Sequence, residues 1–252
     1  MTPYRRRLFG CPRPRALAAL VFPLFSLTPA FANADTDLGF SLGYTWTAPS
    51  DVHIDQPSTA SAATFADVHW RSRSLQPPLY YGLRATRWFG SARLGAGAEF
   101  VHYKIHAEVD RMVPVRGTWN GAPVATTAPM RERVQDFNVS HGVNYVAANV
   151  LYRWRARLPP GEWTPYVGGG PVLYMLHPET TVNDQAQNGP YQTSGLGGHG
   201  FAGIAYSLAT GLRFFAEVKF DAGRAKVGLA GGGHGATNLR TLHLVAGLGY
   251  LF

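Results

Sequence analysis

The chain has 252 residues, a length that fits one domain or at most two. Charged residues make up 15%, against roughly 25% in an ordinary soluble domain, while Gly (29), Phe (14), Tyr (12) and Trp (6) are abundant, which excludes an ordinary soluble helical enzyme. The formal charge of +8 suggests a nucleic-acid partner, but five of the 23 basic residues lie in the first 15 positions. The other 18 basic residues and the 15 acidic residues leave a net charge of +3, which excludes a nucleic-acid footprint.

Residues 1–34 predict a secretory signal peptide. A basic stretch, Arg5–Arg15, precedes the apolar run Ala16–Leu27, and small residues suited to signal cleavage follow. The run of 12 residues is too short to cross a bilayer of ~30 Å as a helix. We therefore expect residues 35–252 to form the mature domain. The only cysteine, Cys11, is then removed, which excludes disulfides, thiol nucleophiles and cysteine-ligated metals.

Apolar residues alternate with small or polar residues in segments of about ten residues along the rest of the chain. In Leu38–Trp46, for example, every even-numbered residue is large and apolar. No later run of 18 apolar residues exists, which excludes helical spans. The pattern predicts an all-β fold, an eight-stranded antiparallel transmembrane β-barrel of the bacterial outer membrane. The strands are expected near 37–48, 77–88, 93–107, 134–154, 163–177, 191–208, 211–222 and 239–252.

The connections between these strands alternate in length. Short turns at 89–92, 155–161 and 209–211 predict the periplasmic end, and long loops predict the extracellular end. The loops are expected at 49–76, 108–133, 178–190 and 223–238. The segment 64–72 also alternates, which predicts an extension of the second strand above the membrane with a break at Pro77–Pro78. Six aromatic residues near the short turns predict an interfacial girdle: Trp88, Phe89, Tyr152, Trp154, Tyr166 and Tyr250. A soluble periplasmic barrel is the alternative.

Eight strands enclose a lumen that side chains fill, so a general diffusion pore is excluded. Five charged residues are expected on the inner face. Buried charges are tolerated when they are paired, so these residues predict a plug of ion pairs. They are Arg84, Glu99, Arg213, Glu217 and Lys219.

Three histidines on consecutive strands are expected at one height. About ten tilted residues cross an apolar band of ~25 Å, which places His102, His141 and His177 at the outer-leaflet boundary. Two imidazoles with a carboxylate, such as His102, His177 and Glu179, could hold a non-haem metal. The alternation of 163–177, however, predicts that His177 and Glu179 face the lumen while His102 faces lipid, so a bulge is needed to bring them together. The alternative is that each histidine is an interfacial residue with no role.

Several short motifs resemble the lipid A oxidase family of outer-membrane proteins and, more broadly, OmpA-like eight-stranded barrels. The similarity runs from about residue 79 to the C-terminus. The motifs are Glu99-Phe-Val-His102-Tyr-Lys104, Gly142-Val-Asn144, Leu151-Tyr-Arg153-Trp154, Pro165-Tyr-Val-Gly-Gly, His177-Pro-Glu179, Tyr191-Gln192 and Glu217-Val-Lys219.

The resemblance implies an oxidoreductase that uses dioxygen to oxidise the proximal glucosamine of lipid A to an aminogluconate unit. It also implies a divalent metal of the iron or manganese type. Carried over by position, the catalytic candidates are His102, Lys104, Asn144, Gln192, Glu217 and Lys219, and the metal ligands are His102, His177 and Glu179. The expected partner is lipid A or lipopolysaccharide of the outer leaflet, bound by a monomer.

Basic side chains near the extracellular end could hold the lipid phosphates. These are Lys104 and the loop residues Arg111, Arg131 and Arg133. A second hypothesis is a non-enzymatic surface barrel with a structural, adhesive or recognition role. A third is a lipid A deacylase or acyltransferase. Ser140 and His141 argue against this third hypothesis, because adjacent strand residues face opposite sides.

Overall fold

The computed structural model describes residues 35–89, 93–154 and 163–252, without the side chains of residues 139–141. Each of the eight barrel strands pairs antiparallel with the next, and the pairing of β15 with β1, from Asp37↔Leu251 to Thr47↔Thr241, closes the ring. The strands are β1 (Thr36–Thr47), β5 (Tyr81–Phe89), β6 (Leu94–Ala107), β9 (Val134–Arg153), β10 (Trp163–Leu176), β13 (Gln192–Ser207), β14 (Leu212–Gly228) and β15 (His234–Leu251). The predicted all-β eight-stranded barrel is confirmed. The predicted signal peptide and Cys11 lie outside the described residues.

An apolar belt covers the outside of the barrel. On β1, Leu38, Phe40, Leu42 and Trp46 point outward and are each 47–51% exposed, whereas Thr45 is fully buried inside. Leu83 on β5 and Val150 on β9 belong to the same surface. Such a surface is stable only in contact with lipid, so the closed ring spans a bilayer. No helix in the described part of the chain is long and apolar enough to cross a membrane.

A network of ion pairs fills the lumen, as predicted. Lys219 bonds Glu99 and lies 3.8 Å from Glu217, which in turn bonds Arg84. The Tyr166 hydroxyl donates to Glu217 at 2.6 Å. The side chains of Lys219 and Glu217 are at most 1% exposed. Because each buried charge has a partner, the lumen is a solid plug with no continuous water path through this layer.

A second polar layer lies on the extracellular side of the plug. The fully buried Asp221 accepts hydrogen bonds from the Tyr174 hydroxyl and from His243, both at 2.5 Å. Tyr80 and Tyr103 pack around the same histidine ring. These contacts lock strands on opposite sides of the barrel together, because a buried polar group without a partner costs about 1–3 kcal/mol.

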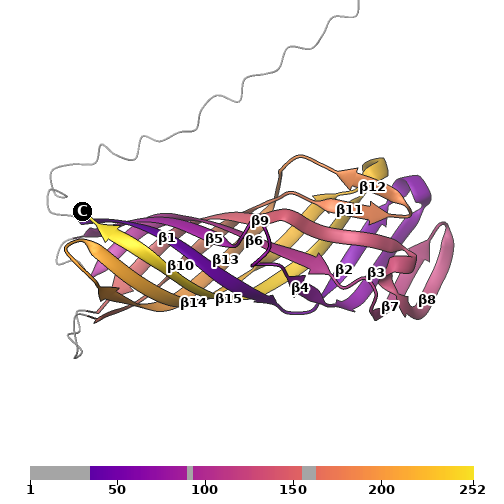
Figure 1. Cartoon of the computed structure of the whole chain (residues 1–252). Coiled ribbons are helices and arrows are strands. Elements are labelled where there is room, and N and C mark those ends of the chain that lie inside the picture. The colour runs from indigo at the N-terminus through magenta and orange to yellow at the C-terminus, as the bar shows by residue number, and fades with distance from the viewer. Residues whose placement is uncertain (1–34, 90–92, 155–162) are drawn as a thin grey trace, which may run out of the picture. The chain divides into compact units, whose positions relative to one another are not determined.

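The residues expected to form long extracellular loops form strands instead. They are β2 (Ser50–Gln56), β3 (Ser61–Val68), β4 (Trp70–Ser72), β7 (Met112–Trp119), β8 (Ala122–Pro129), β11 (Glu179–Val182) and β12 (Gln185–Asn188), with the 3₁₀ turns η2 (Pro57–Thr59), η3 (Met130–Glu132) and η4 (Ala230–Gly232). Figure 1 shows β2, β3, β7 and β8 at the end of the sheet opposite the C-terminus. β9 alone has 20 residues, about twice what crosses an apolar band of ~25 Å. The barrel wall therefore continues above the membrane.

The apolar core continues into this extracellular part, where it includes Ile54, Phe65, Ile105 and Met130, all at most 2% exposed. The core explains why the segments order as strands. The prediction for 64–72 is partly confirmed, because β4 pairs with β6 above the site where β5 pairs with it. β3 instead pairs with β2 and β7.

β8 ends the extracellular sheet, and among the described strands it pairs with β7 alone. A two-residue turn at Asn120–Gly121, both with positive φ, joins them, so Trp119↔Ala122 is a hydrogen-bonded pair. The odd-numbered residues of β8 then direct their backbone groups to the free edge. Two of these positions are Pro123 and Pro129, which have no N–H, and they limit pairing with another strand.

The alternation of β10 is opposite to the prediction. Tyr166, Val172, Tyr174 and Leu176 face the lumen and are at most 6% exposed, while Leu173 faces out at 38%. Glycines make this inward packing fit: a Cβ at Gly197 or Gly223 would lie 2.7 or 2.5 Å from the Tyr174 ring. Trp88 is also inside, at 3%. Trp88 and Tyr166 therefore do not belong to an interfacial girdle, whereas Trp154 and Tyr250 are 45–46% exposed on the outside.

Candidate functional site

Polar side chains gather on the outer wall at the extracellular edge of the apolar belt. We call this surface the outer ledge and define it as His102, Lys104, Asn144, Arg71 and Arg73. Even-numbered residues of β6 and β9 face outward, and below the ledge they are apolar, such as Phe100 and Val146. At the ledge, His102, Lys104 and Asn144 are only 3–5% exposed although they lie on the outer face. Other parts of the protein therefore cover these polar side chains at the height where the apolar belt ends. The ledge marks the extracellular edge of the belt.

Three of the neighbours of His102 lie among the described residues. Its Nδ1 is 2.8 Å from Asn144 Oδ1, across the pair His102↔Asn144. Its ring stacks on Tyr81 with a centroid distance of 5.1 Å. Gly142 covers the remaining side in a φ of +114°, and a Cβ there would lie 2.2 Å from the imidazole. Only glycine fits at this position, so the backbone of β9 itself shapes the pocket around His102.

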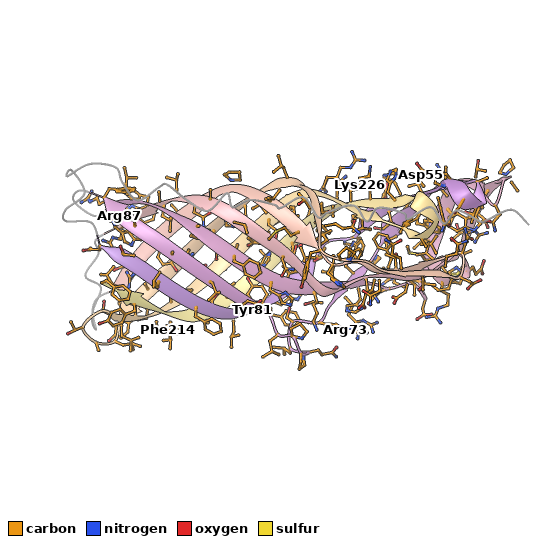
Figure 2. The ribbon with its side chains drawn as sticks, turned by 90° about the horizontal axis from the view of Figure 1, so that it is seen from above. Asp55, Arg73, Tyr81, Arg87, Phe214 and Lys226 are labelled. Atoms are coloured by element: carbon orange, nitrogen blue, oxygen red, sulfur yellow. The ribbon has the colours of Figure 1, made fainter. Side chains whose placement is uncertain are left out.

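A protruding segment, residues 73–79, covers Lys104, and its residues 75–79 are all exposed. β4 pairs with β6 down to Ile105, and β5 pairs with it up to His102. Between these two ladders, beside residues 103 and 104, the chain loops out. Lys104 Nζ donates to the Pro77 carbonyl at 2.8 Å, and Arg73 N donates to the Lys104 carbonyl at 3.4 Å. Leu75 and Leu79 on this segment are 74% and 45% exposed. In Figure 2, Arg73 lies on the same side of the barrel as Tyr81 and further from the end marked by Arg87 and Phe214.

The electrostatic surroundings of the ledge are mixed. Burial, followed by the charges of Arg73 and Lys104, lowers the pKa of His106 to about 4, so this ring is neutral at physiological pH. Burial would raise the pKa of Glu108, but hydrogen bonds from Arg111 and Arg71 hold it below its ordinary value. Glu108 bridges these two arginines and offsets one of their two positive charges, and Arg73 and Lys104 lie closer to the belt.

Burial and the neighbouring Glu179 raise the pKa of Asp136, which sits on β9 above the ledge. A like charge nearby disfavours ionisation of the Asp136 carboxyl, as burial does. Acidic side chains as well as basic ones therefore lie in the region above the ledge.

The structure separates the predicted catalytic residues into groups. His102, Lys104 and Asn144 come together on the outer ledge. Glu217 and Lys219 belong to the plug, on the other side of the barrel wall, and cannot reach a substrate at the ledge. Gln192 accepts a hydrogen bond from the Gly228 N–H at 2.9 Å and pairs with Leu176, so it lies beyond β10. The six catalytic candidates therefore do not lie in one place in the structure.

The predicted metal ligands are also apart. His102 is level with Asn144 and Met175, so His177 lies two residues higher on β10. Two strand spacings of ~4.8 Å already separate His102 from Met175 by about 10 Å. Glu179 pairs with Asn138 on β9, which lies nearer the extracellular end than Asn144. No group of three or more His, Cys, Asp or Glu residues in the described parts of the chain could hold a metal ion, so the residues present do not fit this centre.

The structure also changes the predicted direction of His177 relative to His102. The even-numbered residues of β10 face the lumen, so its odd-numbered residues face outward, as His102 does. His177 follows the strand and packs against the exposed Tyr191 ring at 5.0 Å. The side chain of His141 lies outside the described part of the structure.

The three loop arginines predicted to bind phosphate each pair with an acidic residue of the same loop. Arg111 bonds Glu108 at 3.2 Å, Arg131 bonds Asp110, and Arg133 bonds Glu132 at 3.2 Å. Sequence analysis missed Arg73 and Tyr81, and it named Gly142 only as part of a motif. Pro77–Pro78 was a signal for the protruding segment, since it interrupts an alternating pattern beside a strand.

No protein-family profile matches the chain. A search of curated proteins also found no match. Solved structures that match include OprG of Pseudomonas aeruginosa, an outer membrane protein, with 16% identity, 87% of this chain and 96% of that chain covered, and a TM-score of 0.46. They also include Neisserial surface protein A (13%, 87% and 97%, 0.41) and the outer membrane protease OmpT of Escherichia coli (10%, 90% and 99%, 0.42).

Identities of 10–16% and TM-scores below 0.5 carry no argument about what this chain does. Its class follows from its own strand pairing and apolar belt. The protein is an eight-stranded β-barrel of the bacterial outer membrane, with a plugged lumen and an ordered extracellular extension.

Proposed function

We propose that the protein is a surface-recognition barrel that binds lipopolysaccharide of the outer leaflet through the outer ledge, without a catalytic step. The observation that carries this proposal is the position of the ledge. Arg73 is exposed at the extracellular edge of the apolar belt, and Lys104 lies next to it, covered by the protruding segment. The phosphorylated sugars of lipid A lie at this height in an outer membrane, so the two charge patterns are complementary.

The protruding segment supports the same proposal. Leu75 and Leu79 expose apolar surface next to the belt, and Arg73 adds a cation between the leucines and the extracellular sheet. A segment with apolar tips below a cation suits the boundary between acyl chains and phosphates, where a charged side chain costs only ~0–1 kcal/mol. Lys104 lies directly beneath this segment.

The proposal is tested by measuring how much lipid A stays bound to the purified barrel, by native mass spectrometry. Arg73→Ala combined with Lys104→Met removes both cations while keeping the aliphatic stem of the buried lysine. Because a hydrogen bond to a charged group contributes about 1.5–3 kcal/mol, we expect at least a tenfold loss of affinity for bisphosphorylated lipid A. Affinity for dephosphorylated lipid A should change little.

Arg116→Ala is the matched control, because Arg116 is an exposed cation on β7, in the extracellular extension. It should bind lipid A like the unmodified protein. Equal retention of both lipid forms by the double variant and the unmodified protein would contradict the proposal.

Oxidation of lipid A is the second candidate function. One observation favours it: three residues that the resemblance carries over, His102, Lys104 and Asn144, lie together on the lipid side of the wall. Mass spectrometry of lipid A from cells that express the protein, grown with and without oxygen, separates the two functions. An oxygen-dependent product that disappears with His102→Ala supports oxidation. Unchanged lipid A in cells with a well-folded, metal-supplied barrel leaves recognition alone.

A further inference from the structure

Three exposed cations lie on the outer wall of β14 and β15, and we call this surface the basic face: Arg224, Lys226 and Arg240. Below them, the outward residues of both strands are apolar and belong to the belt, such as Val218 and Leu244 at 52% and 54% exposed. The belt ends at the pair Phe220↔Leu242, and the next outward pair is Ala222↔Arg240. Both strands therefore change from apolar to cationic side chains at the same point of the wall.

The three cations form one cluster, away from the outer ledge. Arg240 is opposite Ala222, so Arg224 is its diagonal neighbour, and Lys226 is the next outward residue of β14. Such neighbours on one face of a sheet are roughly 7 Å apart. In Figure 2, Lys226 and Arg73 lie on opposite sides of the barrel. The basic face and the ledge share no residue, so the basic face is a separate surface.

Neighbouring side chains do not neutralise the charges of the basic face. In the described part of the chain, no carboxylate forms an ion pair with any of the three cations. Two carboxylates lie on β2, which pairs with β15 on the side away from β14. Asp51 accepts a hydrogen bond from the Asp67 N–H at 3.0 Å, and Asp55 lies 3.8 Å from the His234 ring. The basic face therefore presents its charges to a partner outside the barrel.

The height of the basic face indicates which partner it meets. Each residue of a tilted strand climbs about 2.5 Å, so Arg240 lies about 5 Å above the end of the belt, and Arg224 and Lys226 lie about 10–15 Å above it. The phosphates of lipid A lie close to the belt. The sugars of the lipopolysaccharide inner core, which carry carboxylates and phosphates, lie beyond them. Arg224 and Lys226 are therefore at the height of the core sugars.

We propose that the basic face binds the anionic sugars of the lipopolysaccharide inner core. Arg224 and Lys226 pair with core carboxylates and phosphates, so the charges of the two surfaces are complementary. The proposal goes beyond the outer ledge, because it adds a contact on another side of the barrel with a part of lipopolysaccharide that lipid A alone lacks. The membrane's own lipid is favoured over a soluble polyanion, since the latter would first have to displace the lipopolysaccharide that surrounds the barrel.

The test compares two affinities of the purified barrel by native mass spectrometry. One ligand is rough lipopolysaccharide with a phosphorylated inner core, and the other is lipid A alone. The unmodified protein should bind the core-bearing ligand about fivefold more tightly, a modest ratio because exposed ion pairs contribute little each. Arg224→Gln combined with Lys226→Gln should abolish this preference. Its affinity for lipid A should stay unchanged, since both side chains lie above the lipid A phosphates, and this affinity also shows that the variant is folded.

Arg116→Gln combined with Arg131→Gln is the matched control, because it removes the same charge from exposed positions of the extracellular extension. It should keep the full preference for the core-bearing ligand. The outcome is separate from that for the outer ledge, whose variant changes the affinity for lipid A itself.

Three results would overturn the proposal: an unmodified protein without the preference, a basic-face variant that keeps it, or an equal loss in the control. Equal affinity of the basic face for heparin in the same assay would also overturn it, because the face would then take free polyanions.

Discussion

Lys219 holds the plug together, and removing its charge is the sharpest perturbation of the fold. Its ammonium bonds Glu99 and lies 3.8 Å from Glu217, with no exposure of its side chain. Lys219→Met keeps the volume of the side chain and removes only the charge. Glu217 then retains Arg84, but Glu99 keeps only a 3.4 Å contact with Asn149.

Removing one partner of a buried ion pair costs about 3–5 kcal/mol, because it leaves an uncompensated buried charge. We expect Lys219→Met to lower the free energy of unfolding by this amount. Glu99→Gln in the same chain removes the stranded charge, so the double variant should recover about 2 kcal/mol of the loss. Lys226→Met is the control, since Lys226 is exposed on the same strand and should change stability by less than about 0.5 kcal/mol.

The assay is reversible urea unfolding of the barrel in lipid vesicles, followed by tryptophan fluorescence. Two results would contradict the stabilising role assigned to Lys219. One is a Lys219→Met variant within about 1 kcal/mol of the unmodified protein. The other is a double variant in which the two losses add instead of offsetting each other, which would show that Glu99 and Lys219 are not energetically coupled.

Three further predictions concern the extracellular side. Gly142→Ala should destabilise the barrel by about 1–3 kcal/mol and displace the His102 ring, because its Cβ would lie 2.2 Å from the imidazole; urea unfolding and NMR of that ring check this, and a change below 0.5 kcal/mol would contradict it. His106 should titrate near pH 4 in NMR instead of near 6.5, so stability from its neutral ring is complete above pH 6.5 and is lost as the pH falls toward 4; a midpoint at 6.5 or above would contradict the assigned burial. Replacing Pro123 and Pro129 together by Val should restore two outward N–H groups on β8 and cause concentration-dependent self-association in analytical ultracentrifugation, while a barrel that stays monomeric would show that these prolines do not protect the edge.

The membrane part of the fold could be predicted from sequence because lipid imposes a strict period of two. The apolar residues of Leu38–Trp46 and the charges of Arg213, Glu217 and Lys219 fall on opposite faces, as the alternation requires. The long segments between the strands looked like loops because they bury apolar residues such as Phe65 and Met130 inside the protein instead of exposing them to lipid. No lipid-facing period marks such strands.

The candidate site was harder to predict because its geometry depends on irregularities. Counting residues placed His102, His141 and His177 at one height, but the β6–β9 register shifts between Tyr103 and Ile105. This shift adds residues to β9 above Asn144. The direction of β10 failed for another reason: aromatic residues normally mark the lipid face, yet Tyr174 packs inward against glycines of strands distant in sequence.

The central claim is that the outer ledge and its protruding segment contact the phosphorylated sugars of lipid A. The most direct measurement places a photo-crosslinking amino acid at Gln76, which is exposed on the protruding segment, in intact outer membranes. The same amino acid at Thr126, exposed on β8, is the reference position. We expect a covalent adduct with lipid A at position 76 and none at position 126. No lipid A adduct at 76, or equal adducts at both positions, would contradict it.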